Sequence, residues 1–261
     1  MSCSEQKPLF WQRQPVLPLE VQRFLRQRLE AALHAPRDRV LLVWPAVLGA
    51  PKLRAEHPGG LPEPLLLAHA ARMLAAVGAA DPEAAWSEAL ERFPDTAQAG
   101  PAGWLPGGAW GHLGPLVSLR SGVVLSALTG LPEGDTYLLH AAAALFDLAL
   151  YHETHDALEA LWQDAGGDLR QGLQGLILLA AGYHHQQLHN TAGAAAVWEE
   201  GLARLEPFQG RVATPWGAVE HRDALQFTEE RLAYLGALPG KGEDADPEAR
   251  WSMPVPRWEI V

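Results

Sequence analysis

The sequence contains almost no cysteine and very little lysine, and each shortage excludes a class of protein. Cys3 is the only cysteine among the 261 residues, so neither an internal disulfide nor a zinc site with several thiolate ligands can form. Lys7, Lys52 and Lys241 are the only lysines, and the formal net charge is −11. Nucleic-acid binding requires a dense basic face that replaces the counterions of the phosphates. We therefore expect no nucleic-acid partner.

Long apolar segments and familiar catalytic motifs are missing as well. The longest apolar runs reach about a dozen residues, whereas a membrane-spanning helix needs roughly 20. The first residues, MSCSEQKPLFWQRQP, lack the apolar core of a secretory signal. The sequence has no G-x-S-x-G, no glycine-rich phosphate loop and no His-Glu-x-x-His. We expect a cytoplasmic protein that has no membrane partner.

Alanine, leucine and tryptophan are abundant, and apolar residues make up 48% of the chain. Alanine and leucine favour helices, whereas the β-branched residues that favour strands are scarce. Ten tryptophans are available as large core side chains. We predict an all-α fold, a bundle of antiparallel helical hairpins in which an N-terminal helical region packs on a C-terminal helical domain.

Changes in composition divide the chain into three parts. Residues 1–130 form an N-terminal helical region without a recognised relative, and residues 131–238 form a helical domain. Residues 239–261 are an acidic tail that is rich in proline. Trp251 and Trp258 lie in this tail, and their large apolar side chains indicate that it docks on the protein.

In the N-terminal region, apolar residues at helical spacing predict four helices. One begins after Pro18 with a stripe from Val21 to Leu33, the next follows Pro64 and ends near Gly78, the third begins at Asp81-Pro82, and the fourth covers residues 116–128. Residues 39–49 fit either a short strand or a buried helix interrupted at Pro45. The density of glycine and proline predicts a long loop over residues 94–115.

The C-terminal half shows clearer helical patterns. We predict helices over residues 136–146, 151–163 and 169–188, another after the Asn190-Thr191 cap, and a last one that carries Leu225, Thr228, Leu232 and Leu235. Residues 206–221 are predicted to be a loop. The helix over 169–188 is apolar on nearly every side between Leu176 and Tyr183, which predicts a central position.

The residues best suited to chemistry lie in the helix over 151–163. His155, Glu159 and Trp162 follow one another at positions i, i+4 and i+7, so they project from one face. Glu153 and Asp156 lie beside them. One interpretation is a buried polar network in which imidazole, carboxylate and indole satisfy one another and determine helix pairing. We favour this network, because intact carboxylate metal sites usually show a second full set of ligands.

The other interpretation is a divalent-metal site. His184 on the following helix could meet a carboxylate across the helix pair, and His155, Glu159 and His184 would then be the ligands. A histidine near a helix C-terminus is also favoured by the helix dipole alone. The complete candidate cluster is Glu153, His155, Asp156, Glu159, Trp162, Gln174 and His184.

The segment from Leu145 to about Leu205 resembles the bacterial and archaeal family catalogued as domain of unknown function 309. The residues that carry the resemblance are Phe146, Tyr151, Glu153, His155, Leu158, Glu159 and Trp162, followed by Gln174, Gly175, Ile177, Leu179, Ala180, Ala181 and His184. With the last helix it covers about 100 C-terminal residues. The resemblance implies a small all-helical domain and no known activity.

Four positions depart from the pattern of this family. Asp147 stands where the family has asparagine, Ala149 where it has glycine, His152 where it has tyrosine, and Asp156 where it has glutamate. The turn at Ala149 must therefore form without glycine. The shorter carboxylate of Asp156 would weaken any metal or acid–base role that requires glutamate.

Two classes of function remain open. The favoured one is a non-catalytic interaction or scaffold module that binds a partner protein or a second copy of itself. The alternative is a metal-binding protein or a metal-dependent hydrolase that uses His155, Glu159 and His184. The first predicts a buried cluster without a cavity, and the second predicts a water-accessible cluster in which imidazole and carboxylate converge. No substrate or small-molecule ligand follows from the sequence.

Overall fold

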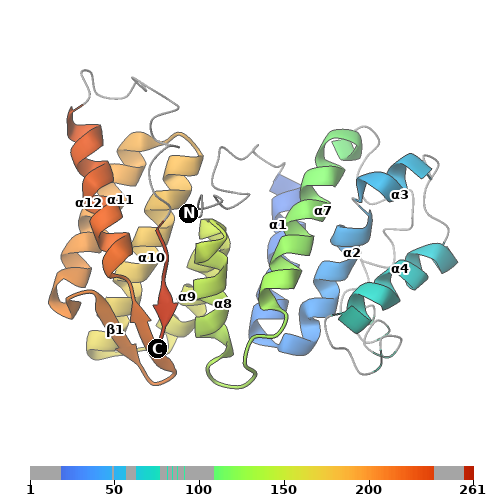
Figure 1. The fold of residues 1–261 in the computed structure, drawn as a ribbon, viewed down its shortest axis with the longest axis horizontal. Helices are drawn as coiled ribbons and strands as arrows, with labels where there is room; N and C mark the ends of the chain where they lie inside the picture. The colour runs from blue at the N-terminus through green and yellow to red at the C-terminus, as the bar shows by residue number, and fades with distance from the viewer. Residues whose placement is uncertain are drawn as a thin grey trace, which may run out of the picture. The chain divides into compact units, whose positions relative to one another are not determined.

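In the computed structural model, the protein is built from helices and one small three-stranded sheet (Figure 1). The structure describes residues 19–48, 50–56, 63–76, 81, 84, 87, 91, 109–237 and 256–261. These residues form two compact units, divided between Leu131 and Pro132. The prediction of an all-α fold class is confirmed. Among the described helices, none is long and apolar enough to cross a membrane.

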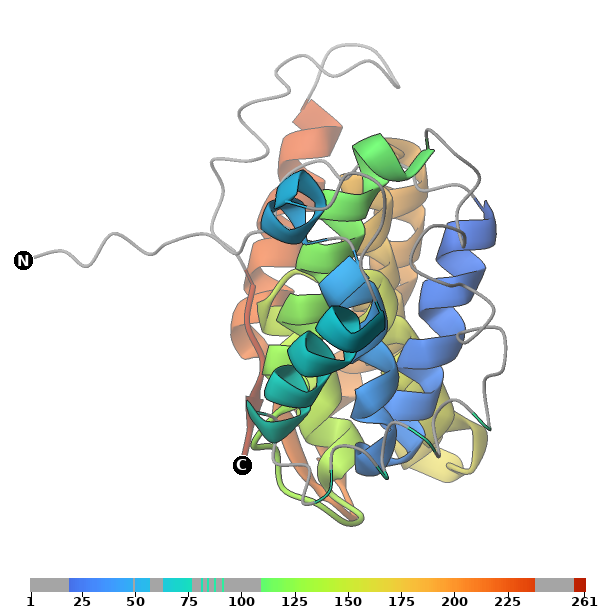
Figure 2. The same cartoon turned by 90° about the vertical axis from the view of Figure 1, so that its right-hand side faces the viewer.

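The first unit is organised around a short, fully apolar helix. Its elements are α1 (Leu19–His34), η1 (Pro36–Arg39), α2 (Val40–Leu48), α3 (Pro51–Glu56), α4 (Glu63–Ala76) and α7 (Ala109–Leu128). Helix α2 contacts α1, α4 and α7, and α4 crosses in front of it in Figure 2. Because α2 has neighbours on several sides, Val40, Leu41, Leu42, Val43 and Val47 are buried. The open choice is thus decided in favour of a helix for residues 40–48, and Pro45 lies inside this helix without interrupting it.

Two predictions from glycine, proline and capping residues have different outcomes. At Asp81 the cap is confirmed, because the carboxylate Oδ1 accepts the backbone N–H of Ala84 at 3.0 Å. The predicted loop over 94–115 is wrong for residues 109–115, which form the start of α7 and include Pro115. Helix α7 as a whole packs on α2, and tertiary packing of this kind can override local preference. Residues 94–108 lie outside the described part of the chain.

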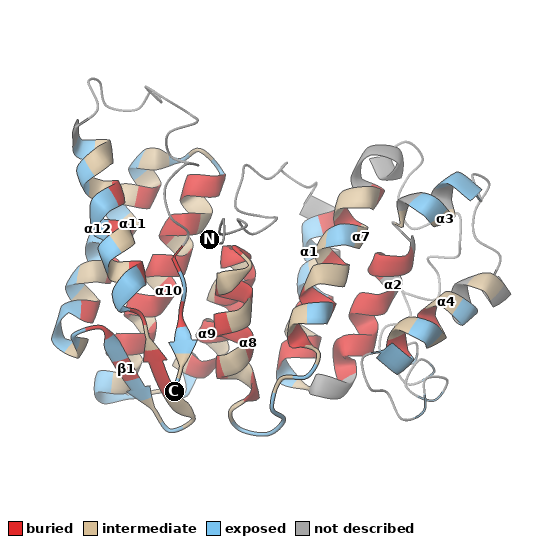
Figure 3. Ribbon diagram, viewed as in Figure 1, coloured by how far each residue is buried: buried red, intermediate tan, exposed pale blue. Residues whose placement is uncertain are grey.

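The second unit is a succession of packed helix pairs. Its helices are α8 (Tyr137–Asp147), α9 (Tyr151–Gln163), α10 (Gly167–Gln187), α11 (Thr191–Leu205) and α12 (Arg222–Ala237), and consecutive helices pack on one another along the chain. These bounds agree with the predicted helices. Helix α10 is buried along most of its length between α9 and α11, which confirms its predicted central position (Figure 3).

A small sheet replaces the loop predicted for residues 206–221. After η2 (Glu206–Phe208), strands β1 (Arg211–Thr214) and β2 (Gly217–Glu220) form an antiparallel hairpin. Val212 and Val219 pair across it and are both buried. The loop prediction was wrong because each strand has only four residues, too few to show a clear alternation of apolar and polar side chains.

The end of the tail is part of this sheet. Strand β3 (Glu259–Ile260) pairs antiparallel with β2, and the neighbouring Trp258 is 3% exposed. The indole of Trp258 stacks on the ring of Phe146, with centroids 3.8 Å apart and planes inclined by 8°. The predicted docking of the tail is therefore confirmed for residues 256–261. Trp251 lies outside the described residues.

Candidate functional site

The turn before α9 positions the candidate residues. It has the backbone of a helix C-cap, in which Leu150 N–H donates to the carbonyl of Leu145 at 2.9 Å. Ala149 takes the left-handed conformation at φ 58°, so this turn forms without glycine, as expected. The side-chain amide of Gln187 on α10 donates to the carbonyl of Ala149 at 2.8 Å. The start of α9 is thereby tied to α10.

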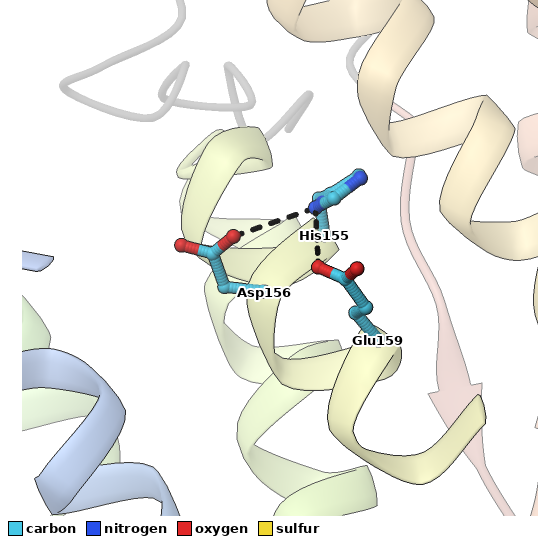
Figure 4. A group of neighbouring side chains, drawn as sticks. All are labelled: His155, Asp156 and Glu159. Carbon is cyan, nitrogen blue, oxygen red and sulfur yellow. Dashed lines mark hydrogen bonds and ion pairs between the residues drawn. The ribbon is translucent and has the colours of Figure 1, made fainter. Parts of the chain in front are cut away.

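Three side chains of α9 converge at one point. His155 Nδ1 lies 3.4 Å from Asp156 Oδ1 and 3.9 Å from Glu159 Oε2 (Figure 4). One ligand-type atom from each residue lies within 4.8 Å of the other two. In Figure 4 dashed lines join the imidazole to each of the two carboxylates. Helix geometry explains the approach of His155 to Glu159, because residues four positions apart share a face, whereas His155 and Asp156 are neighbours in sequence.

This group is open to water on one side, contrary to the expectation of a buried cluster. The side chains of His155 and Glu159 are 32% and 41% exposed, while that of Asp156 is only 4% exposed. The reason is the orientation of α9, whose apolar residues Ala157, Leu158 and Leu161 take the buried face. Only Asp156 among the three lies close enough to that face to be covered.

Sequence reasoning missed His152, which it treated only as a departure from the family pattern. Its Nε2 lies 4.0 Å from Asp156 Oδ2. The His152 ring stacks on that of His184 from α10, with centroids 5.1 Å apart and planes inclined by 19°. The spacing of residues 152, 155, 156 and 159 is i, i+3, i+4 and i+7, a complete helical face. This spacing was the signal that could have identified His152.

The other candidates are placed elsewhere. Glu153 is buried in the first turn of α9 and does not belong to the group of converging ligand atoms. Gln174 is half-buried on α10 and is also outside that group. His184 is near His152 rather than among the three converging residues of α9. The structure therefore brings together His155, Asp156 and Glu159 from the predicted set. His184 stacks on His152, which in turn lies near Asp156.

Trp162 contacts an arginine at the end of α9. The guanidinium of Arg170 lies 3.7 Å from the centroid of the indole. The same group donates to the carbonyls of Trp162 and Ala165, both at 3.2 Å. A cation at this position satisfies carbonyls that a helix C-terminus leaves without partners and complements the helix dipole. The indole therefore supports the cap of α9.

The segment that carries this site matches the model of a known sequence family. Residues 139–197 match the family model described as a domain of unknown function, DUF309. The predicted resemblance is thus confirmed for this segment, which runs from α8 into α11 and contains every residue of the candidate cluster. No curated protein and no solved structure matched the chain. The DUF309 match provides no reaction, so the chemistry has to be argued from the side chains.

Two of the three distances between the converging atoms fit ligands that share one cation, and the three atoms lie within 4.8 Å of one another. Bonds of about 2.1 Å from Zn²⁺ to nitrogen or oxygen place two ligand atoms at most about 4.2 Å apart. The distances from His155 Nδ1 to the two carboxylates, 3.4 and 3.9 Å, are within this limit. One imidazole and two carboxylates leave coordination positions open to water, as in catalytic zinc sites. The face can also act as a set of ion pairs when its histidines are protonated.

Proposed function

We propose that the DUF309 segment of this protein binds a divalent metal ion through His155, Asp156 and Glu159. The observation that carries the proposal is the convergence of three ligand-type atoms within 4.8 Å on one accessible helix face. Their accessibility favours this function over a purely architectural network, because ions and ligands can reach side chains that are 32% and 41% exposed. We further propose that the protein works in the cytoplasm.

The nature of the site follows from its donors. Imidazole and carboxylate together suit zinc and its neighbours among the divalent transition metals. An ion held by three side chains would keep positions for water or substrate, the arrangement from which metal-dependent hydrolases start. We propose binding and assign no reaction, since three ligands by themselves select no substrate.

The test is a measurement of metal affinity on the full chain. The protein is stripped with a chelator and titrated with Zn²⁺ by calorimetry, with bound metal counted by elemental analysis after dialysis. We expect saturable binding that falls at least about tenfold in His155→Ala and in Glu159→Gln, because each substitution removes a ligand. Circular dichroism establishes that both variants remain helical.

His34 provides the matched control, because it is an exposed histidine on α1, in the first unit. His34→Ala should bind Zn²⁺ like the unaltered protein. Absence of saturable binding to the unaltered chain would refute the proposal, as would equal affinity in His155→Ala. Loss of helical structure in His155→Ala alone would instead favour an architectural role, which Glu159→Gln, a change at an exposed carboxylate, tests independently.

A non-catalytic interaction module is the second candidate function. It is favoured by the tail, which β2 and Phe146 hold by strand pairing and aromatic stacking. Proteins that bind extended peptides use the same combination of backbone pairing and side-chain pockets. If two copies of the chain exchange these tails, sedimentation should detect a dimer that Trp258→Ala weakens.

A further inference from the structure

We propose that the surface formed by α8 and β2 is a docking site for an extended segment of a partner protein, and that the chain's own residues 256–261 occupy this surface in its absence. The segment carries an aromatic residue followed two positions later by an aliphatic one. The proposal rests on the second candidate function, the interaction module, and does not depend on metal binding. The way in which the surface holds residues 256–261 shows what it recognises.

The first part of the surface is an aromatic platform, the ring of Phe146. Tyr151 and Tyr183 contact this ring edge-on, with centroids 5.1 and 5.8 Å away and planes inclined by 67° and 82°. All three rings are buried, and Trp258 stacks on Phe146 with its plane inclined by only 8°. Because the neighbouring rings hold Phe146 in place, an aromatic side chain can stack there at little cost in ordering the receptor.

The second part of the surface binds the backbone of the segment at two points. Asp147 Oδ1 on α8 accepts the backbone N–H of Trp258 at 3.1 Å. Ala218 on β2 donates its N–H to the backbone oxygen of Val261 at 2.8 Å and accepts the N–H of Val261 at 3.0 Å. These contacts involve only the main chain of the segment, so other extended segments can form them as well.

Selectivity comes from alternate side chains, because successive residues of an extended chain point to opposite sides. Trp258 is 3% exposed and Ile260 is half-buried, whereas Glu259 between them is exposed. A Cβ built on Gly217 would lie 3.3 Å from Cγ2 of Ile260 and 3.8 Å from Cδ2 of Leu139 on α8. The glycine therefore leaves room for an aliphatic side chain beside α8. The surface thus selects an aromatic and an aliphatic residue two positions apart.

The resident segment is not the best occupant of this surface, which favours a partner protein over the tail of a second copy. Nε1 of Trp258 is buried, and no residue in the described part of the chain accepts its N–H. A buried donor without an acceptor opposes binding, whereas phenylalanine at this position would stack on Phe146 without burying an N–H group. The resident pairing is also short, since β3 has only two residues.

The test measures the binding of labelled six-residue peptides to the full chain by fluorescence anisotropy, with a chelator present. The receptor is Trp258→Ala, which removes the resident aromatic anchor. We expect saturable binding of the peptide PRFEIV, and binding at least about tenfold weaker for PRAEIV, because buried aromatic anchors dominate such interfaces. PRFQIV is the matched control, since it changes only the exposed position, and it should bind like PRFEIV.

The unaltered chain should bind PRFEIV at least about tenfold more weakly than Trp258→Ala, because a tethered segment competes at an effective concentration of about a millimolar. Adding Asp147→Ala to Trp258→Ala should weaken the binding of PRFEIV, while adding Asp147→Asn should retain it, since the amide oxygen still accepts an N–H. Val261→Pro removes the N–H that pairs with Ala218 by a change at an exposed residue, and it replaces Trp258→Ala if that variant unfolds.

The outcomes separate the proposal from the candidate function on which it rests. Absence of saturable PRFEIV binding to both Trp258→Ala and Val261→Pro would overturn the proposal, as would equal binding of PRFEIV and PRAEIV. Stronger binding of PRWEIV than of PRFEIV would identify the tail of a second copy as the better occupant and also refute it. A dimer in sedimentation without peptide binding would leave the interaction module intact, and absence of both would remove the two together.

Discussion

At the scale of single residues, close approach of helices depends on glycine. The surface of α10 that faces α11 carries Gly182, and a Cβ built there would lie 2.3 Å from Cδ1 of Trp198. The indole N–H of Trp198 donates to the carbonyl of Leu179 at 3.2 Å, which holds the ring against the α10 backbone. Because Trp198 is 1% exposed, it has little room to move away from an added methyl group.

We therefore expect Gly182→Ala to destabilise the protein by about 1–3 kcal/mol, the usual range for overpacking a core. Gly236 in α12 is the control, since a Cβ built there meets nothing within 4 Å. Gly236→Ala should leave stability unchanged or raise it by up to about 1 kcal/mol, because alanine is the better helix former. Urea unfolding of the three proteins measures both changes. Equal stability of Gly182→Ala and the unaltered protein would show that α11 shifts without cost.

The sequence provided the right residue types for the site but not their grouping. His155 and Glu159 could be predicted to share a face, because a spacing of four residues depends only on the helix, but the approach of Asp156 to His155 could not. The burial of the group could not be predicted, since the rotation of α9 about its axis depends on its contacts with α8 and α10. For the same reason, the pairing of His152 with His184 required tertiary structure.

At the scale of elements, the docked tail depends on a carboxylate at the end of α8. Asp147 Oδ1 accepts the backbone N–H of Trp258 at 3.1 Å. Burial raises the pKa of Asp147, although this hydrogen bond and Arg257 lower it in part. A carboxyl group whose pKa is higher in the folded state stabilises the fold at low pH, and this contribution is lost as pH rises from about 3.8 through the folded value.

Asp147→Asn should therefore stabilise the protein at pH 7, because the amide oxygen still accepts the Trp258 N–H without a charge to desolvate. Asp147→Ala should destabilise it, since the buried N–H of Trp258 loses its acceptor. The difference between Asn and Asp should disappear near pH 3, where both side chains are neutral. Thermal unfolding of the three proteins at pH 3 and 7 tests this, and a stability difference that does not change with pH would contradict it.

At the scale of the whole molecule, pH should act on stability through His221, which precedes α12. The ring is fully buried, and Nδ1 lies 3.1 Å from the carbonyl of Val219. Burial lowers the pKa of His221, although the contact with Val219 and the charge of Glu220 raise it in part. The unfolded chain therefore binds a proton at higher pH than the folded chain, so stability is full above about pH 6.5 and falls below it.

We expect the urea midpoint of the unit that contains His221 to decrease between pH 7 and pH 5. His221→Asn is the informative variant, because an amide can keep the donor to Val219 and does not titrate. Its midpoint should depend less on pH over this interval, and the other histidines contribute equally to both proteins. Circular dichroism follows the unfolding. Parallel profiles for the two proteins would show that His221 does not control the pH response.

The sequence by itself determined the helices of the C-terminal half, their approximate bounds and the residue types of the candidate site, because helical periodicity, capping and three- and four-residue spacing are local properties. It also carried the DUF309 resemblance. Only the tertiary structure decided the packing of residues 109–115 as helix, the hairpin at 211–220, the exposure of His155 and Glu159, and the meeting of His152 with His184. These features depend on contacts between segments far apart in the chain, whose energies outweigh local preference and leave no periodic mark in the sequence.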